Sequence, residues 1–421
     1  MAQRATALKT IEARKRMCPL WRVNLQNGRF FARPGASRLA DCEGGAAAWA
    51  PVAKLEGMSD APVQLRPEIL AQRAYQQGKP AAPTAFKLSS NEVPFEPLPA
   101  VLAAVNSVSG FNRYPDASAK AVREALGAHY GLAADQVLIG AGSVSLLYQA
   151  VQAAAGPGDE VLYSWRSFEA YPGIVTVAGA TSVQAPLTSD AAVDLDALAD
   201  AITDRTRVVI VCTPNNPTGP AVKQDDFERF MARVPGKLLV IADEAYIEFV
   251  TDPTVLNATR LLPEYPNLIV ARTFSKAYGL AGLRVGYMLG NADILRAFGV
   301  TAIPFTITEQ AQAATLAVMQ EADAVRERVN EITARRDEVR RALIDQGWPV
   351  PESQANFVWL PAREQTEGVN DILLEGGIVA RAFPGDGIRV SIGEEASVSP
   401  LLAACWQAIE RYPYLRQTDA E

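Results

Sequence analysis

The segment Arg272–Arg284 combines residue types that suit a phosphate-bearing aldehyde. Its Lys276 follows an apolar run that ends at Ala271, and a lysine amine can form a Schiff base with an aldehyde. The hydroxyl of Ser275 and the guanidinium of Arg284 can hold a phosphate, because arginine makes paired, charge-assisted hydrogen bonds. Taken alone, the segment could equally be a glycine-rich turn with an exposed lysine.

Two further apolar runs are followed by polar side chains that fit the same kind of cofactor. Asp243 follows Leu238–Ala242, and its carboxylate can pair with a protonated pyridine nitrogen, which makes the ring a better electron sink. Tyr246 can place its phenol against a ring hydroxyl. Asn216, in the loop after Arg207–Cys212, can donate to the same oxygen. Each of these motifs alone also fits a turn or a helix cap.

Anion-binding features occur at two other places. Gly140–Ser145 lies between a predicted strand and a predicted helix, so its free N–H groups and the positive helix end form a seat for an anion. The loop lacks the spacing of a dinucleotide-binding loop and the lysine of a P-loop, which argues against both. Arg381 and Arg389 can each bind a carboxylate through two parallel hydrogen bonds, although either one alone fits a solvated surface arginine.

The elements between these motifs must bring them together. From residue 86 to about 300, predicted strands and helices alternate, and the apolar runs suit strands buried on both faces of a mainly parallel sheet. This alternation indicates an α/β layer fold. Asp194 is a predicted N-cap for the helix Leu195–Ile202. The other predicted elements are the strands Gln136–Gly140, Glu160–Tyr163, Arg207–Cys212, Leu238–Ala242 and Leu268–Ala271, and the helix Ser143–Ala155.

After about residue 308 the pattern changes to that of a smaller α+β region. Glu309–Asp345 is typical of one long helix, rich in Ala, Glu and Arg. A closing helix is predicted near Pro400–Arg411. Between the two helices, the predicted strands are Asn356–Leu360, Gly377–Ala380 and Gly387–Ile392.

Composition excludes several classes of function. The 421-residue chain has a net charge of -7, which argues against a nucleic-acid or anionic-membrane partner, and no apolar run is long enough to span a membrane. Its four cysteines are widely separated and form no C-x-x-C or zinc spacing, so we expect a reduced, cytoplasmic protein without a metal site. His129 is the only histidine and is predicted to be structural, which leaves proton transfer to Lys, Tyr, Asp or Glu.

Residues 1–57 differ from the rest, with ten Lys and Arg against four Asp and Glu. No apolar stretch follows the basic start, which argues against a secretory signal. We expect an over-extended gene start or a disordered leader, with a targeting peptide as the alternative. The predicted division of the remainder is an N-terminal arm over 58–90, a large cofactor-binding domain over 91–300 and a small C-terminal domain over 301–421.

Together, these motifs resemble the fold-type I aminotransferases of class I/II, specifically the histidinol-phosphate aminotransferase family. The resemblance runs from about Leu65 to Arg411. It implies pyridoxal 5'-phosphate as cofactor, a large domain with a mainly parallel seven-stranded sheet, and a smaller α+β C-terminal domain. It rests on the signatures Leu88–Glu92, Asn112–Asp116, Gly140–Ser145, Pro214–Gly219, Asp243–Tyr246, Thr273–Arg284, Asn356–Leu360 and Gly387–Gly393, in this order.

The resemblance also implies roles for single residues around the cofactor ring. Lys276 would bear the cofactor and shuttle the proton, and Asp243 would pair with the pyridine nitrogen. Asn216 and Tyr246 would contact the ring hydroxyl. Phe168, which could otherwise be a core residue, would stack on the ring.

The same resemblance implies how phosphate and substrate are held. Arg389 would bind the amino-acid carboxylate, with Arg381 nearby, and Asn91 would line the site. A homodimer is implied, because a tyrosine of the neighbouring subunit would reach the phosphate. The phosphate-binding set is Ser143 and Val144 through their backbone amides, Ser275, Arg284 and Tyr114 across the subunit boundary.

Within the family, the sequence is most similar to the aromatic amino-acid branch, in Trp165–Glu169 and Ser353–Trp359 among other stretches. The implied reaction moves the amino group of phenylalanine, tyrosine or tryptophan to 2-oxoglutarate, giving an aromatic 2-oxo acid and L-glutamate. Histidinol-phosphate aminotransferase is the alternative, although such enzymes often carry an acidic pair where this chain has Val144 and Ser145. An amino-acid-phosphate decarboxylase shares the cofactor residues. A cofactor-sensing transcription regulator would need a helix-turn-helix, which residues 1–57 do not suggest.

Overall fold

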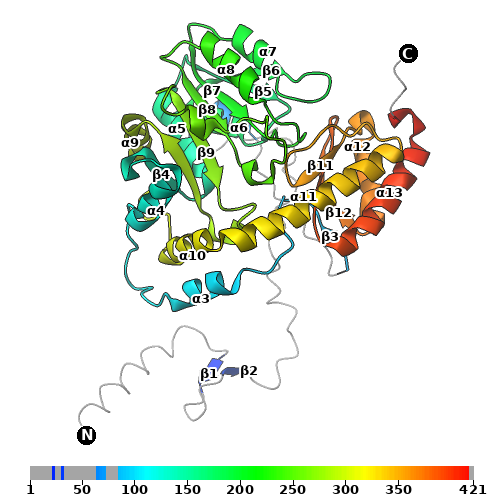
Figure 1. The fold of residues 1–421 in the computed structure, drawn as a ribbon, viewed down its shortest axis with the longest axis horizontal. Helices are drawn as coiled ribbons and strands as arrows, with labels where there is room; N and C mark the ends of the chain where they lie inside the picture. The colour runs from blue at the N-terminus through cyan, green and yellow to red at the C-terminus, as the bar shows by residue number, and fades with distance from the viewer. Residues whose placement is uncertain (1–20, 24–29, 33–62, 73–83, 417–421) are drawn as a thin grey trace. The chain divides into compact units, whose positions relative to one another are not determined.

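The computed structural model describes residues 21–23, 30–32, 63–72 and 84–416 (Figure 1). Its contacts divide the chain into two units, Met1–Leu65 and Arg66–Glu421. In the first unit, β1 (Trp21–Val23) pairs antiparallel with β2 (Phe30–Ala32). The rest of the predicted leader lies outside the described residues. Because residues 66–421 form one unit, the predicted divisions at residues 90 and 300 stay predictions.

A seven-stranded sheet forms the centre of the second unit, in the order β4-β10-β9-β8-β7-β5-β6. All neighbouring pairs are parallel except those of β10, which runs antiparallel to both β4 and β9. The predicted mainly parallel seven-stranded sheet is therefore confirmed. The strands are β4 (Val137–Gly140), β5 (Glu160–Trp165), β6 (Thr181–Pro186), β7 (Thr206–Cys212), β8 (Leu239–Asp243), β9 (Leu268–Thr273) and β10 (Gly286–Gly290).

Apolar side chains leave both faces of this sheet and form two cores. On β8, Leu239 and Ile241 belong to one core, and Val240 and Ala242 belong to the other. This alternation follows from the two-residue period of a strand, and it explains why the buried strands are continuous apolar runs in the sequence. One core lies under α5 (Gly142–Ala154), α6 (Tyr171–Ala178) and α9 (Ala292–Val300), and the other includes residues of α4 (Lys120–Tyr130), α7 (Leu195–Asp200) and α8 (Gln224–Arg233).

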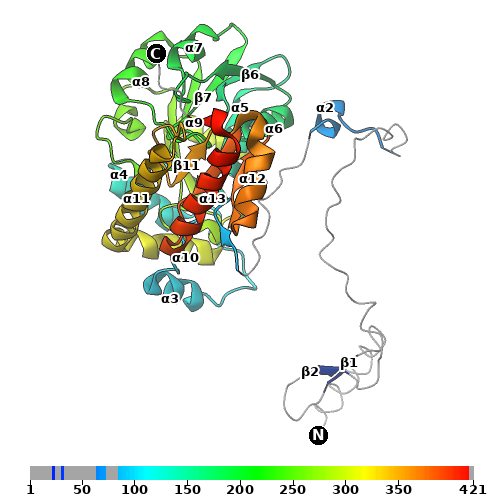
Figure 2. The same ribbon diagram turned by 90° about the vertical axis from the view of Figure 1, so that its right-hand side faces the viewer.

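The C-terminal part is built on a three-stranded antiparallel sheet in the order β11-β14-β13. Figure 2 shows α11, α12 and α13 side by side over this part of the molecule. A short parallel pair links it to the N-terminal segment, because β3 (Phe86–Lys87) pairs with β12 (Ile378–Val379). The remaining elements are β11 (Phe357–Leu360), β13 (Arg381–Phe383), β14 (Gly387–Ser391), α11 (Ala322–Asp345), α12 (Thr366–Glu375), α13 (Val398–Arg411), α3 (Pro99–Ser107), α10 (Glu309–Gln320) and α2 (Pro67–Leu70).

The single helix predicted over Glu309–Asp345 is wrong. The chain forms α10 and α11, which meet at Glu321, where φ is -100° and ψ is 33°. The reason lies in tertiary packing, since α10 packs on α3 and α4 whereas α11 packs on β11 and α13. The two helices therefore pack on different parts of the molecule, and helical periodicity in the sequence does not report a break of one residue between them.

The predicted N-cap of α7 is confirmed, because Asp194 Oδ1 accepts a hydrogen bond of 2.8 Å from the Ala197 N–H. We expect Asp194→Ala to lower the free energy of unfolding by about 1 kcal/mol, because one N–H of the first helical turn loses its acceptor. Asp196→Ala is the matched control, since this side chain is 91% exposed and pairs only at the surface with Arg233; its cost should stay below about 0.5 kcal/mol. Urea denaturation of both variants measures the difference, and equal losses would contradict the capping role.

Candidate active site

The loops that carry the predicted site residues leave the sheet at one edge. In the sheet register, Cys212 at the end of β7 pairs with Asp243 at the end of β8, and Asp243 pairs with Ala271 of β9. Because β10 is antiparallel, its first residue, Gly286, pairs with the last residue of β4 and with Thr273. The carboxyl ends of four strands and the start of a fifth therefore meet, which is where α/β sheets bind ligands.

Lys276 lies directly beyond β9, and the structure gives its amine a neighbourhood suited to nucleophilic attack. Nζ donates a hydrogen bond of 3.0 Å to the carbonyl of Ser90 and lies 5.9 Å from the ring centre of Tyr246. Removal from bulk water, and after it the guanidinium charge of Arg389, lowers the pKa of Lys276 from 10.5 to about 7. A large share of the amine is therefore neutral near pH 7, which is the form that attacks a carbonyl.

Asp243 is almost completely buried at the end of β8. Its Oδ2 accepts a hydrogen bond of 2.7 Å from the hydroxyl of Tyr171, a residue at the start of α6 that sequence reasoning missed. Within the described part of the chain, its Oδ1 has no hydrogen-bond partner. Burial raises the pKa of Asp243 to about 6, against the opposing effect of the Tyr171 hydrogen bond. A buried acceptor of this kind calls for a donor, and a cationic N–H would be the strongest.

Tyr246 follows β8 of the seven-stranded sheet and contacts a residue of the three-stranded sheet. Its hydroxyl accepts a hydrogen bond of 2.9 Å from Asn91 Nδ2, and its ring lies edge-on to Phe357 of β11 at 5.1 Å. Asn91 has a φ of 53° and is held by Ser391 of β14, whose hydroxyl donates to Asn91 Oδ1 at 2.8 Å. Burial raises the pKa of Tyr246, so its phenol keeps its proton at neutral pH.

The four residues predicted to hold a phosphate within one subunit lie close to one another. Ser143 and Val144 occupy the first turn of α5, where N–H groups lack intrahelical partners. Arg284 Nη1 lies 3.2 Å from the hydroxyl of Ser275. A Cβ on Gly286 would lie 2.2 Å from the Ser143 nitrogen, so only glycine lets β10 approach the helix start this closely.

The two predicted carboxylate-binding arginines are cross-strand partners on β13 and β14. Arg389 is buried and donates to Asn216 Oδ1 at 2.6 Å and to the Ser89 carbonyl at 2.7 Å. Arg381 forms an ion pair with Glu169, which precedes α6. The structure thus brings Asn216 to Arg389, a pairing that sequence reasoning did not predict.

Phe168 and Tyr114 have different surroundings. Phe168 is partly buried and packs edge-on against Tyr171 at 5.5 Å, which places it next to the partner of Asp243. Tyr114 is 80% exposed and stacks on Phe305 at 4.5 Å, so a single subunit does not bury it in the site.

Comparison with known proteins identifies the family. The family described as aminotransferase class I and II matches residues 83–404. The chain belongs to this family. The aromatic amino acid aminotransferase of Streptomyces avermitilis is 49% identical over 341 residues, which are 80% of this aminotransferase and 95% of that protein. The protein of the same name from Corynebacterium glutamicum is 50% identical over 329 residues, 77% of this chain and 93% of that one.

Solved structures give the same picture for the fold of this aminotransferase. The histidinol-phosphate aminotransferase of Sinorhizobium meliloti, in complex with pyridoxal-5'-phosphate, is similar with a TM-score of 0.76 and 27% sequence identity. The match covers 85% of this chain and 100% of that structure. The sequence-based recognition of the family and of its fold is confirmed.

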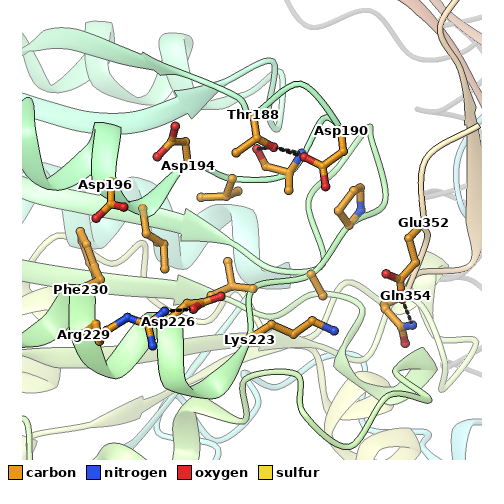
Figure 3. Close-up of a pocket in the computed structure, with 16 residues that line it drawn as sticks. Thr188, Asp190, Asp194, Asp196, Lys223, Asp226, Arg229, Phe230, Glu352 and Gln354 are labelled. Carbon is orange, nitrogen blue, oxygen red and sulfur yellow. Dashed lines mark hydrogen bonds and ion pairs between the residues drawn. The ribbon is translucent and has the colours of Figure 1, made fainter. Parts of the chain in front are cut away.

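A separate pocket of about 420 Å³ lies near α7 and α8, and Figure 3 shows the side chains that line it. Asp194, Asp226 and Lys223 are among them, but none of the predicted site residues of this aminotransferase is. We therefore assign the chemistry to the strand ends and not to this pocket. Among the residues that the structure describes, no His, Cys, Asp and Glu side chains gather in a group that could hold a metal ion. No helix within the described ranges is long and apolar enough to cross a membrane.

The lowered pKa of Lys276 predicts a reactivity profile for this aminotransferase. Because only the neutral amine attacks a carbonyl, we expect the reaction of Lys276 with a small aldehyde in cofactor-free protein to reach half its maximal rate near pH 7. Cyanoborohydride trapping followed by peptide mass spectrometry measures the adduct, and Lys276→Ala checks the assignment. A half-maximal rate near the ordinary value of 10.5 would contradict the depressed pKa.

Proposed function

We propose that this aminotransferase carries pyridoxal 5'-phosphate on Lys276 and moves the amino group of an aromatic L-amino acid to 2-oxoglutarate. The observation that carries the proposal is the pairing of a depressed-pKa lysine with Asp243, whose buried Oδ1 has no partner among the described residues, at adjacent strand ends. A cofactor that needs both an amine and a carboxylate toward its ring nitrogen fits this arrangement.

The chain's own residues fit the cofactor at each end. Asp243 Oδ1 offers an acceptor to the ring N–H, and the negative charge of this carboxylate favours the protonated ring. The first turn of α5, with Ser275 and Arg284, offers N–H, hydroxyl and guanidinium donors to a phosphate. Asn216 and Tyr246 are the candidates for the ring oxygen.

When bound, the cofactor ring supplies an electron sink for the pair of electrons left at the substrate α-carbon. Lys276 takes the α-proton as a neutral amine and returns it, since its pKa of about 7 lets it act as base and then as acid. Arg389 holds the substrate carboxylate and thereby orients the α-carbon toward this amine. Tyr171 fixes the Asp243 carboxylate through its hydrogen bond of 2.7 Å.

The aromatic substrate class is supported by sequence and by the surroundings of Arg389. The Streptomyces avermitilis and Corynebacterium glutamicum relatives carry this activity in their names. The guanidinium of Arg389 lies 5.6 Å from the ring centre of Phe357 and 5.9 Å from that of Phe383, so aromatic surface flanks the carboxylate-binding arginine. Histidinol phosphate is the second candidate, supported by the name of the structural relative at 27% identity.

A homodimer in the cytoplasm completes the proposal. Four large apolar or aromatic residues, Phe111, Tyr114, Val300 and Ile303, are between 74% and 83% exposed. Burying such side chains against another subunit would be favourable. Tyr114 would then reach the phosphate of the partner site.

Half-reactions test the substrate. We expect the visible absorbance of the bound cofactor to convert to the pyridoxamine form when phenylalanine is added without an oxo acid, and to persist with histidinol phosphate. Lys276→Ala is the matched control and should show no turnover. Conversion with histidinol phosphate alone would move the enzyme to that substrate, and release of carbon dioxide would reveal a decarboxylase. Purified protein that develops no cofactor absorbance with added pyridoxal phosphate would refute the proposal.

Mixed dimers test the shared site. We expect Tyr114→Ala to weaken cofactor binding by about tenfold, because a hydrogen bond to a charged phosphate is lost. In a heterodimer of Tyr114→Ala with Lys276→Ala, one of the two sites contains both native residues. At a cofactor concentration that leaves Tyr114→Ala largely empty, mixing the two variants under conditions of subunit exchange should therefore restore turnover. Failure of the mixture to regain activity, despite heterodimers seen by native mass spectrometry, would place Tyr114 outside the partner site.

A further inference from the structure

Three guanidinium groups lie around the ring of Phe383, the last residue of β13. The ring centre of Phe383 lies 5.3 Å from the guanidinium of Arg166 and 5.9 Å from those of Arg381 and Arg389. Arg381 and Arg389 are direct cross-strand partners, so their side chains leave the same face of the small sheet. Because like charges around one ring repel each other, nearby carboxylates would stabilise this arrangement.

Two ion pairs connect the segment after β5 to the hairpin of β13 and β14. Arg166, after β5, donates to Asp386 in the β13–β14 turn, with an Nε–Oδ2 distance of 2.8 Å. In the opposite sense, Arg381 of β13 pairs with Glu169 in the segment after β5. Both members of the second pair are about one-fifth exposed, so water screens their interaction only partly.

The position of the Arg381–Glu169 pair matters for the substrate side chain. Glu169 directly follows Phe168, the proposed ring-stacking residue, and Arg381 lies opposite Arg389, the proposed carboxylate-binding residue. The pair therefore connects the segment that carries the proposed ring-stacking residue to the strand beside the proposed carboxylate-binding arginine. A substrate held by Arg389 would have the Arg381–Glu169 pair as a near neighbour, because the two arginines are cross-strand partners.

The two substrates of the proposed reaction favour different states of the Arg381 guanidinium. An aromatic side chain is uncharged, and an uncompensated guanidinium beside it would be desolvated at a cost. A guanidinium whose edge is paired with a carboxylate still offers its flat face to a ring. The distal carboxylate of glutamate or 2-oxoglutarate, in contrast, would gain from the guanidinium edge itself.

We propose that Glu169 is a specificity-determining residue: it neutralises Arg381 while an aromatic side chain is bound and yields the guanidinium to the distal carboxylate of a dicarboxylic substrate. The inference rests on the proposed aminotransferase function and deepens it. No bond is made or broken in this exchange; one carboxylate replaces another on Arg381.

The experiment compares half-reactions of the holoenzyme with phenylalanine and with glutamate. Glu169→Gln keeps the size of the side chain but removes the competing charge. We expect it to lower the half-saturating concentration of glutamate by roughly three- to tenfold and to leave that of phenylalanine unchanged or higher. Glu169→Ala should shift the same ratio in the same direction, which guards against a folding defect of one variant.

Two controls make the test specific. Asp386→Asn removes the other carboxylate that bridges the same segments, and it should leave the glutamate-to-phenylalanine ratio within about twofold of the unmodified enzyme. The double variant Glu169→Gln/Arg381→Gln should match Arg381→Gln alone, because Glu169 acts only through Arg381. A ratio that Glu169→Gln leaves unchanged, or a double variant that differs from Arg381→Gln, would overturn the inference. If the unmodified enzyme converts with neither amino acid, the proposed function itself fails.

Discussion

The site depends on a carboxylate kept inside an apolar sheet. Asp243 is 3% exposed at the end of β8, between β7 and β9, where a charge without partners is costly. The Tyr171 hydroxyl satisfies one oxygen, but burial still holds the pKa of Asp243 near 6. A cationic ring nitrogen on the other oxygen would reverse that effect. The buried carboxylate of Asp243 therefore favours the binding of a protonated pyridine ring.

A buried ion pair holds the ends of β8 and β9 together. Glu244 follows Asp243 directly, and its carboxylate lies 2.7 Å from the guanidinium of Arg272 on β9. The Glu244 N–H also donates to the Ala271 carbonyl at 2.8 Å. Tyr130 accepts a further hydrogen bond from Arg272, so the buried charges are paired and hydrogen-bonded, as their burial requires. Asp243 and Lys276 are therefore held on strand ends that cannot easily move apart.

Much of the central sheet and of the site at its edge could be predicted from the sequence. Buried parallel strands are continuous apolar runs in the sequence, and their carboxyl ends meet at one edge of the sheet. Asp243 directly follows such a run and Lys276 lies five residues after another, so both were identifiable. The contact of Asn216 with Arg389 spans 173 residues, and that of Glu169 with Arg381 spans 212. Such long-range pairs leave no periodicity or local motif, and neither does the hydrogen bond of Tyr171 to Asp243.

Arg389 of the three-stranded sheet lowers the pKa of Lys276, which follows β9 of the seven-stranded sheet. The guanidinium charge of Arg389 is, after burial, the largest cause of the lowered pKa of Lys276. A substrate carboxylate bound to Arg389 would cancel that charge and raise the pKa of the nearby amine. The lysine would then be a weaker acid in the loaded site than in the empty one, and so would hold the proton that it has removed from the α-carbon. Carboxylate binding by Arg389 and proton transfer by Lys276 would in this way be coupled through the charge of Arg389.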